Sequence, residues 1–83
     1  MNKILIELYI SAIGDHVDVF VPTDIPIRDL TNVIIDGIVE ITNGRYVPSN
    51  GEQLCMMEPL GMLNPMLTLS DYGIIDGAQL YLV

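Results

Sequence analysis

Residues 69–83 read LSDYGIIDGAQLYLV, and they carry the clearest indication of how the chain folds. The polar corner at residues 70–73, SDYG, has side chains that accept hydrogen bonds from nearby backbone amides, so it is predicted to form a tight turn or a single helical turn. The run at residues 78–83 then alternates between two faces with the period of a β-strand. The two faces are Leu80 and Leu82 on one side, and Tyr81 and Val83 on the other.

Two runs near the start of the chain alternate in the same way. Residues 3–10, KILIELYI, are followed by a turn at residues 14–15 and by a second run at residues 16–21. Two alternating runs joined by a short loop that contains glycine predict a β-hairpin. The first and last runs of the chain are the most apolar, so we expect them to lie side by side and parallel in the middle of one sheet. The hairpin residues expected in the core are Ile4, Ile6, Leu8, Val17, Val19 and Val21.

The segment that follows, VPTDIPIRDLTNVIIDGIVEI, changes to a helical period, with apolar residues at steps of three and four and charged residues opposite them. Thr23 and Asp24 offer capping oxygens, and Pro26 suits the first helical turn. Gly44 can adopt the left-handed conformation that ends a helix. Because β-branched residues and Gly37 lower the helix propensity, a strand over this segment is the alternative. The helical face expected in the core consists of Ile27, Leu30, Ile34, Ile38 and Ile41.

The rest of the chain adds short strands. Residues 52–57, EQLCMM, are predicted to form one, whereas the prolines and glycine of residues 58–67 allow at most a very short edge strand. A hairpin, a helix and further strands, in this order, predict an α+β fold in which one helix lies across a sheet. We expect residues 1–83 to form a single domain, with Leu54 and Leu69 completing its core.

Several of these motifs resemble a known family. The LSDYGI corner and the LYLV run resemble the last corner and strand of ubiquitin, and FVPTDIPIRDL resembles the segment that leads into its helix. In order and spacing, VPTDIPIRDLTNVIIDGIVEI and DYGIIDGAQLYLV are similar to the YukD/EsaB-type ubiquitin-like proteins of bacterial type VII (WXG100) secretion systems. The resemblance implies a β-grasp fold, in which a mixed sheet carries one helix packed across it.

The same resemblance implies a function. Proteins of this type are small cytosolic accessory or regulatory proteins that act by contact with protein components of the secretion apparatus, without catalysis. In related actinobacterial systems such a domain is fused to a membrane component of the channel. We therefore expect a cytoplasmic protein, peripheral to a membrane secretion complex.

Composition argues against several classes of partner. Eleven acidic residues against three basic ones give a net charge of −8, so the basic cluster that nucleic acid requires is missing and anionic lipid surfaces are disfavoured. No apolar run approaches the ~18 residues that mark a membrane span, so direct membrane insertion is not expected. A single cysteine, Cys55, excludes an intramolecular disulfide and suits a reducing compartment.

Ubiquitin and the sulfur carriers for molybdopterin and thiamine react through a flexible Gly-Gly tail. This sequence ends at LYLV, so conjugation is not expected. Two alternatives stay open. One is a sulfur carrier or modifier that has been truncated, and the other is a structural domain that associates with itself as a homodimer.

No catalytic residue, cofactor or metal site is predicted. Cys55 lacks a basic partner in the sequence and His16 lies on a different run, so the thiol is expected to be structural or exposed. Metal binding would need ligands clustered at the right spacing. Asp71 and Asp76 are expected to accept hydrogen bonds from backbone amides rather than to bind calcium. The methionines expected to fill gaps in the core are Met56, Met57, Met62 and Met66.

Alternation also places apolar residues on the outer face of the predicted sheet, away from the helix. Ubiquitin docks with this face, and Tyr81 and Val83 match its patch positions on the last strand. A contiguous exposed apolar patch marks an interface, and aromatic side chains are common anchors there. The alternatives are singly solvated side chains, or docking through the helix. The predicted protein-binding patch consists of Leu5, Tyr9, Phe20, Tyr81 and Val83.

Overall fold

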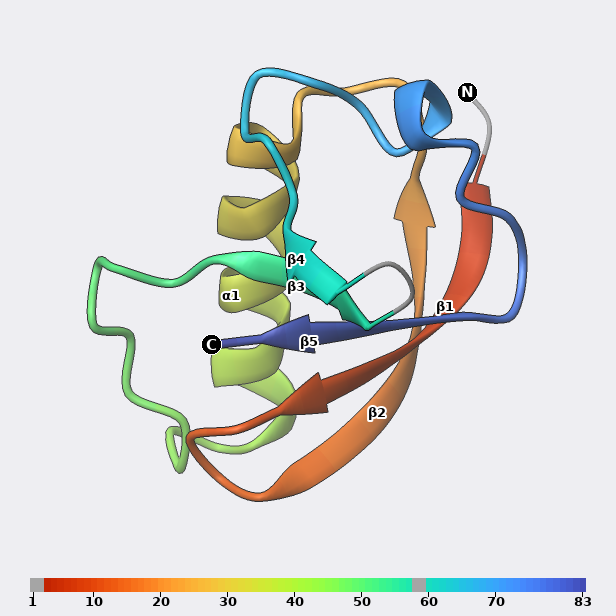
Figure 1. Cartoon of the computed structure of the whole chain (residues 1–83). Coiled ribbons are helices and arrows are strands. Elements are labelled where there is room, and N and C mark those ends of the chain that lie inside the picture. Colours follow the sequence, from red (N-terminus) through yellow and green to blue (C-terminus); the bar gives the residue numbers. More distant parts are fainter. Residues whose placement is uncertain (1–2, 58–59) are drawn as a thin grey trace.

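The computed structural model describes residues 3–57 and 60–83, and this part of the chain forms one mixed sheet with one α-helix packed on it (Figure 1). The strands lie in the order β2-β1-β5-β3-β4, with β1 and β5 parallel and the other neighbours antiparallel. The predicted α+β fold and the central, parallel pairing of the first and last strands are thereby confirmed. The elements are β1 (Lys3–Ile10), β2 (Asp15–Pro22), α1 (Ile27–Ile41), β3 (Leu54–Met57), β4 (Leu60–Met62), the 3-10 turn η1 (Ser70–Tyr72) and β5 (Ala78–Leu82).

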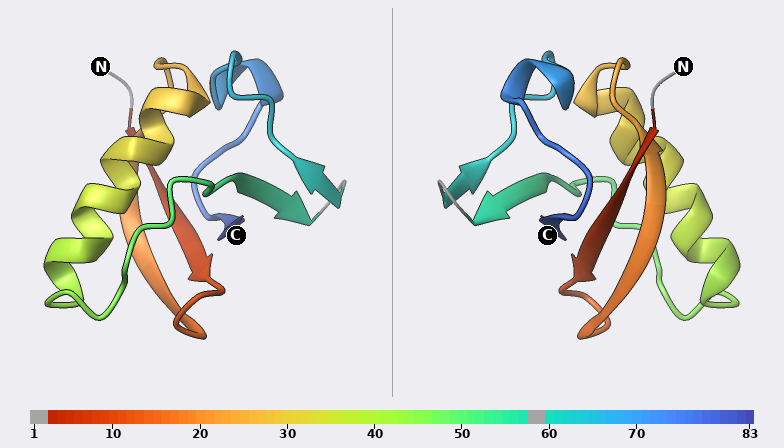
Figure 2. Two further views of the ribbon diagram at one scale, coloured as in Figure 1. Left: turned by 90° about the vertical axis from the view of Figure 1, so that its left-hand side faces the viewer. Right: turned by 90° about the vertical axis from the view of Figure 1, so that its right-hand side faces the viewer.

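The core lies between α1 and one face of the sheet, and Figure 2 shows the helix on that side only. In the middle of the sheet, Leu80 of β5 stands opposite Leu8 of β1 and Met56 of β3. Both leucines are at most 1% exposed. The buried apolar residues are Ile6, Leu8, Ile10, Val21, Ile27, Leu30, Ile34, Ile38, Tyr46, Leu54, Leu63, Leu69, Leu80 and Leu82.

Two parts of the predicted core differ in the structure. Ile41 is 58% exposed, so its predicted burial was wrong. It is the last residue of α1 and lies beside edge strand β2 at the surface, whereas Tyr46, which the helical period does not include, is buried after the helix ends. The remaining predicted core residues are buried or half-buried, the half-buried ones being Ile4, Val17 and Val19.

The start of α1 is capped by a distant loop. Pro26 is the N-cap, and no side chain caps the helix, so the prediction that Thr23 or Asp24 supplies the cap was wrong. These residues precede the N-cap by two and three positions. The Ile27 N–H instead donates to the Leu67 carbonyl oxygen at 2.7 Å, and the next amide along the helix donates to the carbonyl oxygen of residue 65 at 2.9 Å. Helix amides that would lack an intrahelical partner are thus satisfied by tertiary contacts.

The end of α1 follows the prediction. Gly44 has a φ of 81°, and its N–H donates to the Val39 carbonyl oxygen at 3.0 Å. Thr42, the C-cap, donates its hydroxyl to the Ile38 carbonyl oxygen at 2.7 Å. Asn43, directly after the C-cap, is the first residue in the left-handed conformation, with a φ of 52°, so Asn43 and Gly44 together end the helix.

Gly37 provides a test of the helix. It lies in the exposed middle of α1, and a Cβ atom placed on it would meet no atom within 4 Å. We expect Gly37→Ala to raise the free energy of unfolding by about 0.5–1 kcal/mol, because alanine loses less backbone entropy in a helix. Urea denaturation measures the change. Gly44→Ala is the matched control and should be destabilising, and a lowered midpoint for Gly37→Ala would contradict the prediction.

Candidate protein-binding surface

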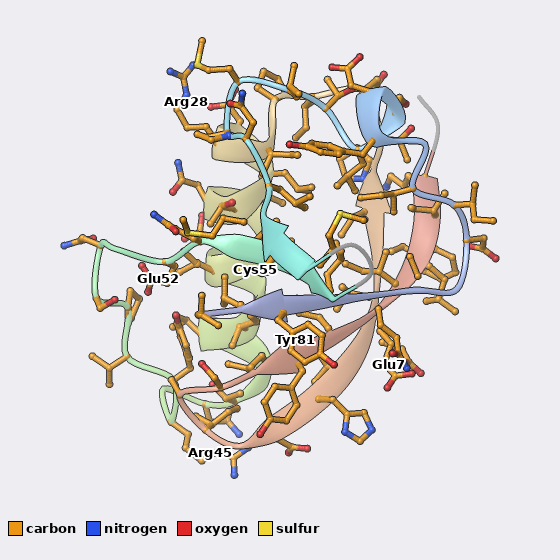
Figure 3. All side chains as sticks on the ribbon, in the orientation of Figure 1. Glu7, Arg28, Arg45, Glu52, Cys55 and Tyr81 are labelled. Carbon is orange, nitrogen blue, oxygen red and sulfur yellow. The ribbon has the colours of Figure 1, made fainter. Side chains whose placement is uncertain are left out.

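The face of the sheet that points away from α1 carries a row of side chains that crosses all five strands. The register aligns Tyr9 with Tyr81 on one side and with His16 on the other, and Cys55 lies between Tyr81 and Met62. We call these five residues the aromatic row. The Tyr9 and Tyr81 ring centroids are 5.7 Å apart, with planes inclined at 58°, a favourable tilted arrangement. Figure 3 shows Tyr81 and Cys55 on this near face.

A second apolar group lies on the same face, near the other end of β1. Leu5 stands opposite Phe20, which is 70% exposed, and we call the two the apolar pair. Val83 is also exposed but lies away from this pair, two residues beyond Tyr81, and it exchanges two backbone hydrogen bonds with Gln53, at 2.9 and 3.0 Å.

A polar row separates these groups. Glu7 stands opposite Asp18 on β2 and Gln79 on β5, and all three side chains are exposed. Leu5 and Tyr9 are four residues apart on β1, which corresponds to about 13 Å along a strand. The predicted patch residues that lie in strands are thus divided by the polar row, with Leu5 and Phe20 on one side of it and Tyr9 and Tyr81 on the other.

The aromatic row also shows how Cys55 and His16 are placed. The two tyrosines stand between them, which puts them three strand spacings, or about 14 Å, apart. At this separation the imidazole cannot take a proton from the thiol directly. In the two ranges that the structure describes, no three His, Cys, Asp or Glu side chains gather as they would around a metal ion.

Asp71 and Asp76 bind backbone amides, as predicted. Asp71 accepts a hydrogen bond from the Thr68 N–H at 2.9 Å, within the corner. Asp76 accepts one from the Leu5 N–H at 2.6 Å, and the Gly77 N–H donates to the Leu5 carbonyl oxygen. The corner thus holds the start of β1, and with it the apolar pair, at the edge of β5.

The methionines follow the prediction only in part. Met56 is half-buried and packs against the core, as expected of a gap-filling side chain. Met62 and Met66 are 66% and 68% exposed, so their predicted burial was wrong. Met62 alternates onto the outer face from the short edge strand β4, and Met66 lies in the loop whose backbone caps α1. The side chain of Met57 lies outside the described residues.

A hydrogen-bonded loop forms one wall of a cleft beside α1. The Tyr46 hydroxyl donates to Glu52 Oε2 at 2.7 Å, and the Ser49 N–H donates to the same oxygen at 2.7 Å. Burial, and then the bond to Glu52, raises the pKa of Tyr46 to about 12. The bond from Tyr46, followed by that from Ser49, holds the pKa of Glu52 below its ordinary value. The cleft measures about 680 Å³, and Arg28 and Asp36 of α1 line its opposite wall.

The helix content bears on membrane insertion. Within residues 3–57 and 60–83, no helix has the length and apolar character needed to span a membrane.

Comparison with known proteins identifies the family. Residues 5–82 match the model of the family described as "WXG100 protein secretion system (Wss), protein YukD". A search of curated proteins gave no significant match.

Solved structures share the fold. The EccD5 ubiquitin-like domain from Mycobacterium xenopi has a TM-score of 0.81 and 16% identity, over 100% of this chain and 94% of that one. The ubiquitin-like domain of the Mycobacterium tuberculosis type VII secretion protein EccD1 has a TM-score of 0.77 and 16% identity, over 100% and 99%. A chain of the MycP5-free ESX-5 inner membrane complex has a TM-score of 0.78 and 13% identity, with 21% of that chain covered.

At these identities the structural likenesses show the fold alone, which is the ubiquitin-like β-grasp fold predicted from the sequence. The family model, in contrast, matches the amino-acid sequence of this chain over nearly its whole length. The chain therefore belongs to the YukD family of the WXG100 protein secretion system.

Proposed function

We propose that the protein is an accessory or regulatory component of WXG100 (type VII) secretion that acts by non-covalent binding to another protein of the apparatus. The single observation that carries the proposal is the aromatic row on a chain of the YukD family. The row crosses the whole sheet on the face that α1 leaves uncovered, and its two central rings are already in contact. Ordered tyrosines lose little entropy on binding and are frequent energetic anchors of interfaces.

The polar row indicates what the partner offers. Glu7 and Asp18 lie beside the aromatic row, and the whole chain carries a net charge of −8. A partner surface that presents apolar side chains to the tyrosines and lysine or arginine to these carboxylates would match both features. The apolar pair, Leu5 and Phe20, would extend the contact beyond the polar row.

We place this activity in the cytoplasm, beside a membrane-embedded secretion complex. The ESX-5 complex, which contains a similar domain, is an inner membrane complex, and the lone Cys55 suits a reducing compartment. Catalysis and conjugation form no part of the proposal. The separation of Cys55 from His16 favours a binding role over thiol chemistry, and intact-mass analysis of the native protein tests for a modified or extended form.

The test adds a charge to the middle of the aromatic row. We expect Tyr81→Asp to abolish secretion of a WXG100 substrate, because the carboxylate would have to be buried unpaired against the partner. Secretion of the substrate into the medium is measured in cells that express the variant at the wild-type level, and the thermal midpoint of the purified variant shows whether it folds.

Gln79→Asp is the matched control, since it adds the same charge to the same face of β5 but within the polar row. It should secrete at least as well as the wild type, because an added carboxylate in the polar row suits a partner that presents lysine or arginine there. Wild-type secretion by a folded Tyr81→Asp variant would rule out the aromatic row as the docking surface. Sedimentation of the wild-type protein over a range of concentrations shows whether the face instead joins two copies.

A further inference from the structure

A second apolar surface lies at the β2 edge of the sheet, on the side that α1 covers. It is a groove of about 230 Å³ between β2 and α1. The groove's helical wall is strongly exposed, with Val33 at 56% and Ile41 at 58%, whereas Phe20 borders the groove at the strand edge and turns its side chain to the outer face. Gly37 lies between Val33 and Ile41 on α1. Because glycine has no side chain, the groove stays open at this position. The residues that line the groove are all apolar: Val19, Phe20, Val21, Val33, Ile34, Gly37, Ile38 and Ile41.

The strand beside this groove has an unpaired edge. β2 lies at the end of the sheet, and among the described strands it pairs with β1 alone. Leu5 directs its N–H and carbonyl groups toward Asp76 and Gly77 beside β5, so the even-numbered residues of β1 bond to β2. The pairing of residue 6 with residue 19 then leaves Asp18 and Phe20 with their backbone groups directed away from the sheet.

The edge and the groove fit one kind of ligand. A segment that paired with Asp18 and Phe20 would continue the sheet beyond β2, and alternate side chains of a strand point to the same face. Every second side chain of the segment would therefore lie over the apolar groove, between β2 and the Val33–Ile41 side of α1. The segment must be extended, with apolar residues at alternate positions.

Charge decides between a second copy of this chain and a different partner. Glu40 stands one helical turn beyond Gly37 on α1, and Asp18 lies on the unpaired strand edge itself, whereas Asp36 lines the other cleft. The described arginines are paired elsewhere, Arg28 with Asp29 and Arg45 with Asp15, at 3.7 and 3.5 Å. Two copies that each carry a net charge of −8 would repel one another across this edge, whereas a basic segment would be attracted.

We propose that the groove between β2 and α1 binds an extended segment of a partner protein, with apolar side chains at alternate positions and lysine or arginine at its ends, as a strand added to β2. This site is separate from the aromatic row.

The test uses the full chain and a synthetic peptide with valines at alternate central positions, threonines between them and lysines at both ends. In an NMR titration, we expect the peptide to shift the amide signals of Asp18, Phe20 and Gly37. Gly37→Leu fills the groove and should weaken peptide binding by about tenfold or more, because the leucine occupies the space of a peptide side chain. Its thermal midpoint shows that it remains folded.

Asn32→Leu is the matched control, since it places the same side chain on the part of α1 that faces the other cleft. It should bind the peptide as the wild type does. A peptide with glutamates in place of the lysines should bind about tenfold more weakly, as expected of a complementary charge.

Three results would overturn the proposal: wild-type binding by Gly37→Leu, shifts confined to Tyr9 and Tyr81, or equal binding of the glutamate peptide. A concentration-dependent dimer that Gly37→Leu disrupts would show that a second copy, not a basic segment, is the occupant. Tyr81→Asp should bind the peptide normally. The secretion assay therefore tests the aromatic row, and the peptide titration tests the groove, independently of each other.

Discussion

Leu80→Ala is expected to lower the free energy of unfolding by about 2–5 kcal/mol, the range found when a buried leucine is cut back to alanine. Leu80 is 1% exposed and stands between Leu8 and Met56 in the central strand of the sheet. The paired strands on both sides restrict how far the surroundings can collapse into the space that the side chain leaves. Small domains are stable by only about 5–15 kcal/mol in total, so a large share of the stability would be lost. Urea denaturation followed by circular dichroism measures the change.

Gln79→Ala is the control, because it changes the neighbouring residue of the same strand on the exposed face. Its effect should stay within about 0.5 kcal/mol. If Leu80→Ala lost no more stability than this control, Leu80 would not be a central core residue.

Alkaline pH should destabilise the protein through Tyr46. The pKa of this phenol in the folded protein is about 12, above the value of 10.0 expected in the unfolded chain. A raised pKa means that the folded state holds the proton more tightly. The contribution is therefore fully present below about pH 10 and is lost as the pH rises through about 12. A difference of about two pKa units corresponds to a loss on the order of 3 kcal/mol.

Tyr46→Phe isolates this contribution, since phenylalanine keeps the ring but cannot ionise. The wild type and the variant are unfolded with urea at a series of pH values up to about 12, and their free energies are compared. The wild-type advantage should shrink as the pH rises. Equal pH dependence in the two proteins would show that Tyr46 is not the group responsible.

The acid side involves the same hydrogen bond. The pKa of Glu52 is lowered, first by the bond from Tyr46. The contribution of the Glu52 carboxylate to stability is therefore present above the ordinary carboxyl pKa, and it is lost as the pH falls through the lowered pKa of the folded protein. The bond between Tyr46 and Glu52 thus stabilises the protein most between these two limits.

The strands and the helix could be predicted because their side chains repeat with the period of the element. Alternation alone identifies Leu8 and Leu80 as inward-facing and Tyr9 and Tyr81 as outward-facing. Steps of three and four residues identify the buried side of α1. These signals are local, and burial of an apolar face is what each element needs to be stable.

Contacts between distant residues could not be predicted in this way. The helix is capped by the Leu67 carbonyl, which lies 40 residues after Ile27, and the period does not reveal that Tyr46 replaces Ile41 in the core. For the candidate site, alternation already places Glu7 between Leu5 and Tyr9, but only the register between strands shows that Asp18 and Gln79 lie beside Glu7 and extend the polar row.

The position of β5 also has a consequence for the order in which the protein is made. β1 and β2 can pair as soon as both have left the ribosome, but β3 joins the sheet only through β5, which follows every other described element in the chain (Figure 1). The carbonyl groups that cap α1 are also translated long after the helix itself. The nascent chain therefore carries an uncapped helix until residues 65–67 emerge and an incomplete sheet until β5 emerges, and we expect the complete fold to form only after translation of β5.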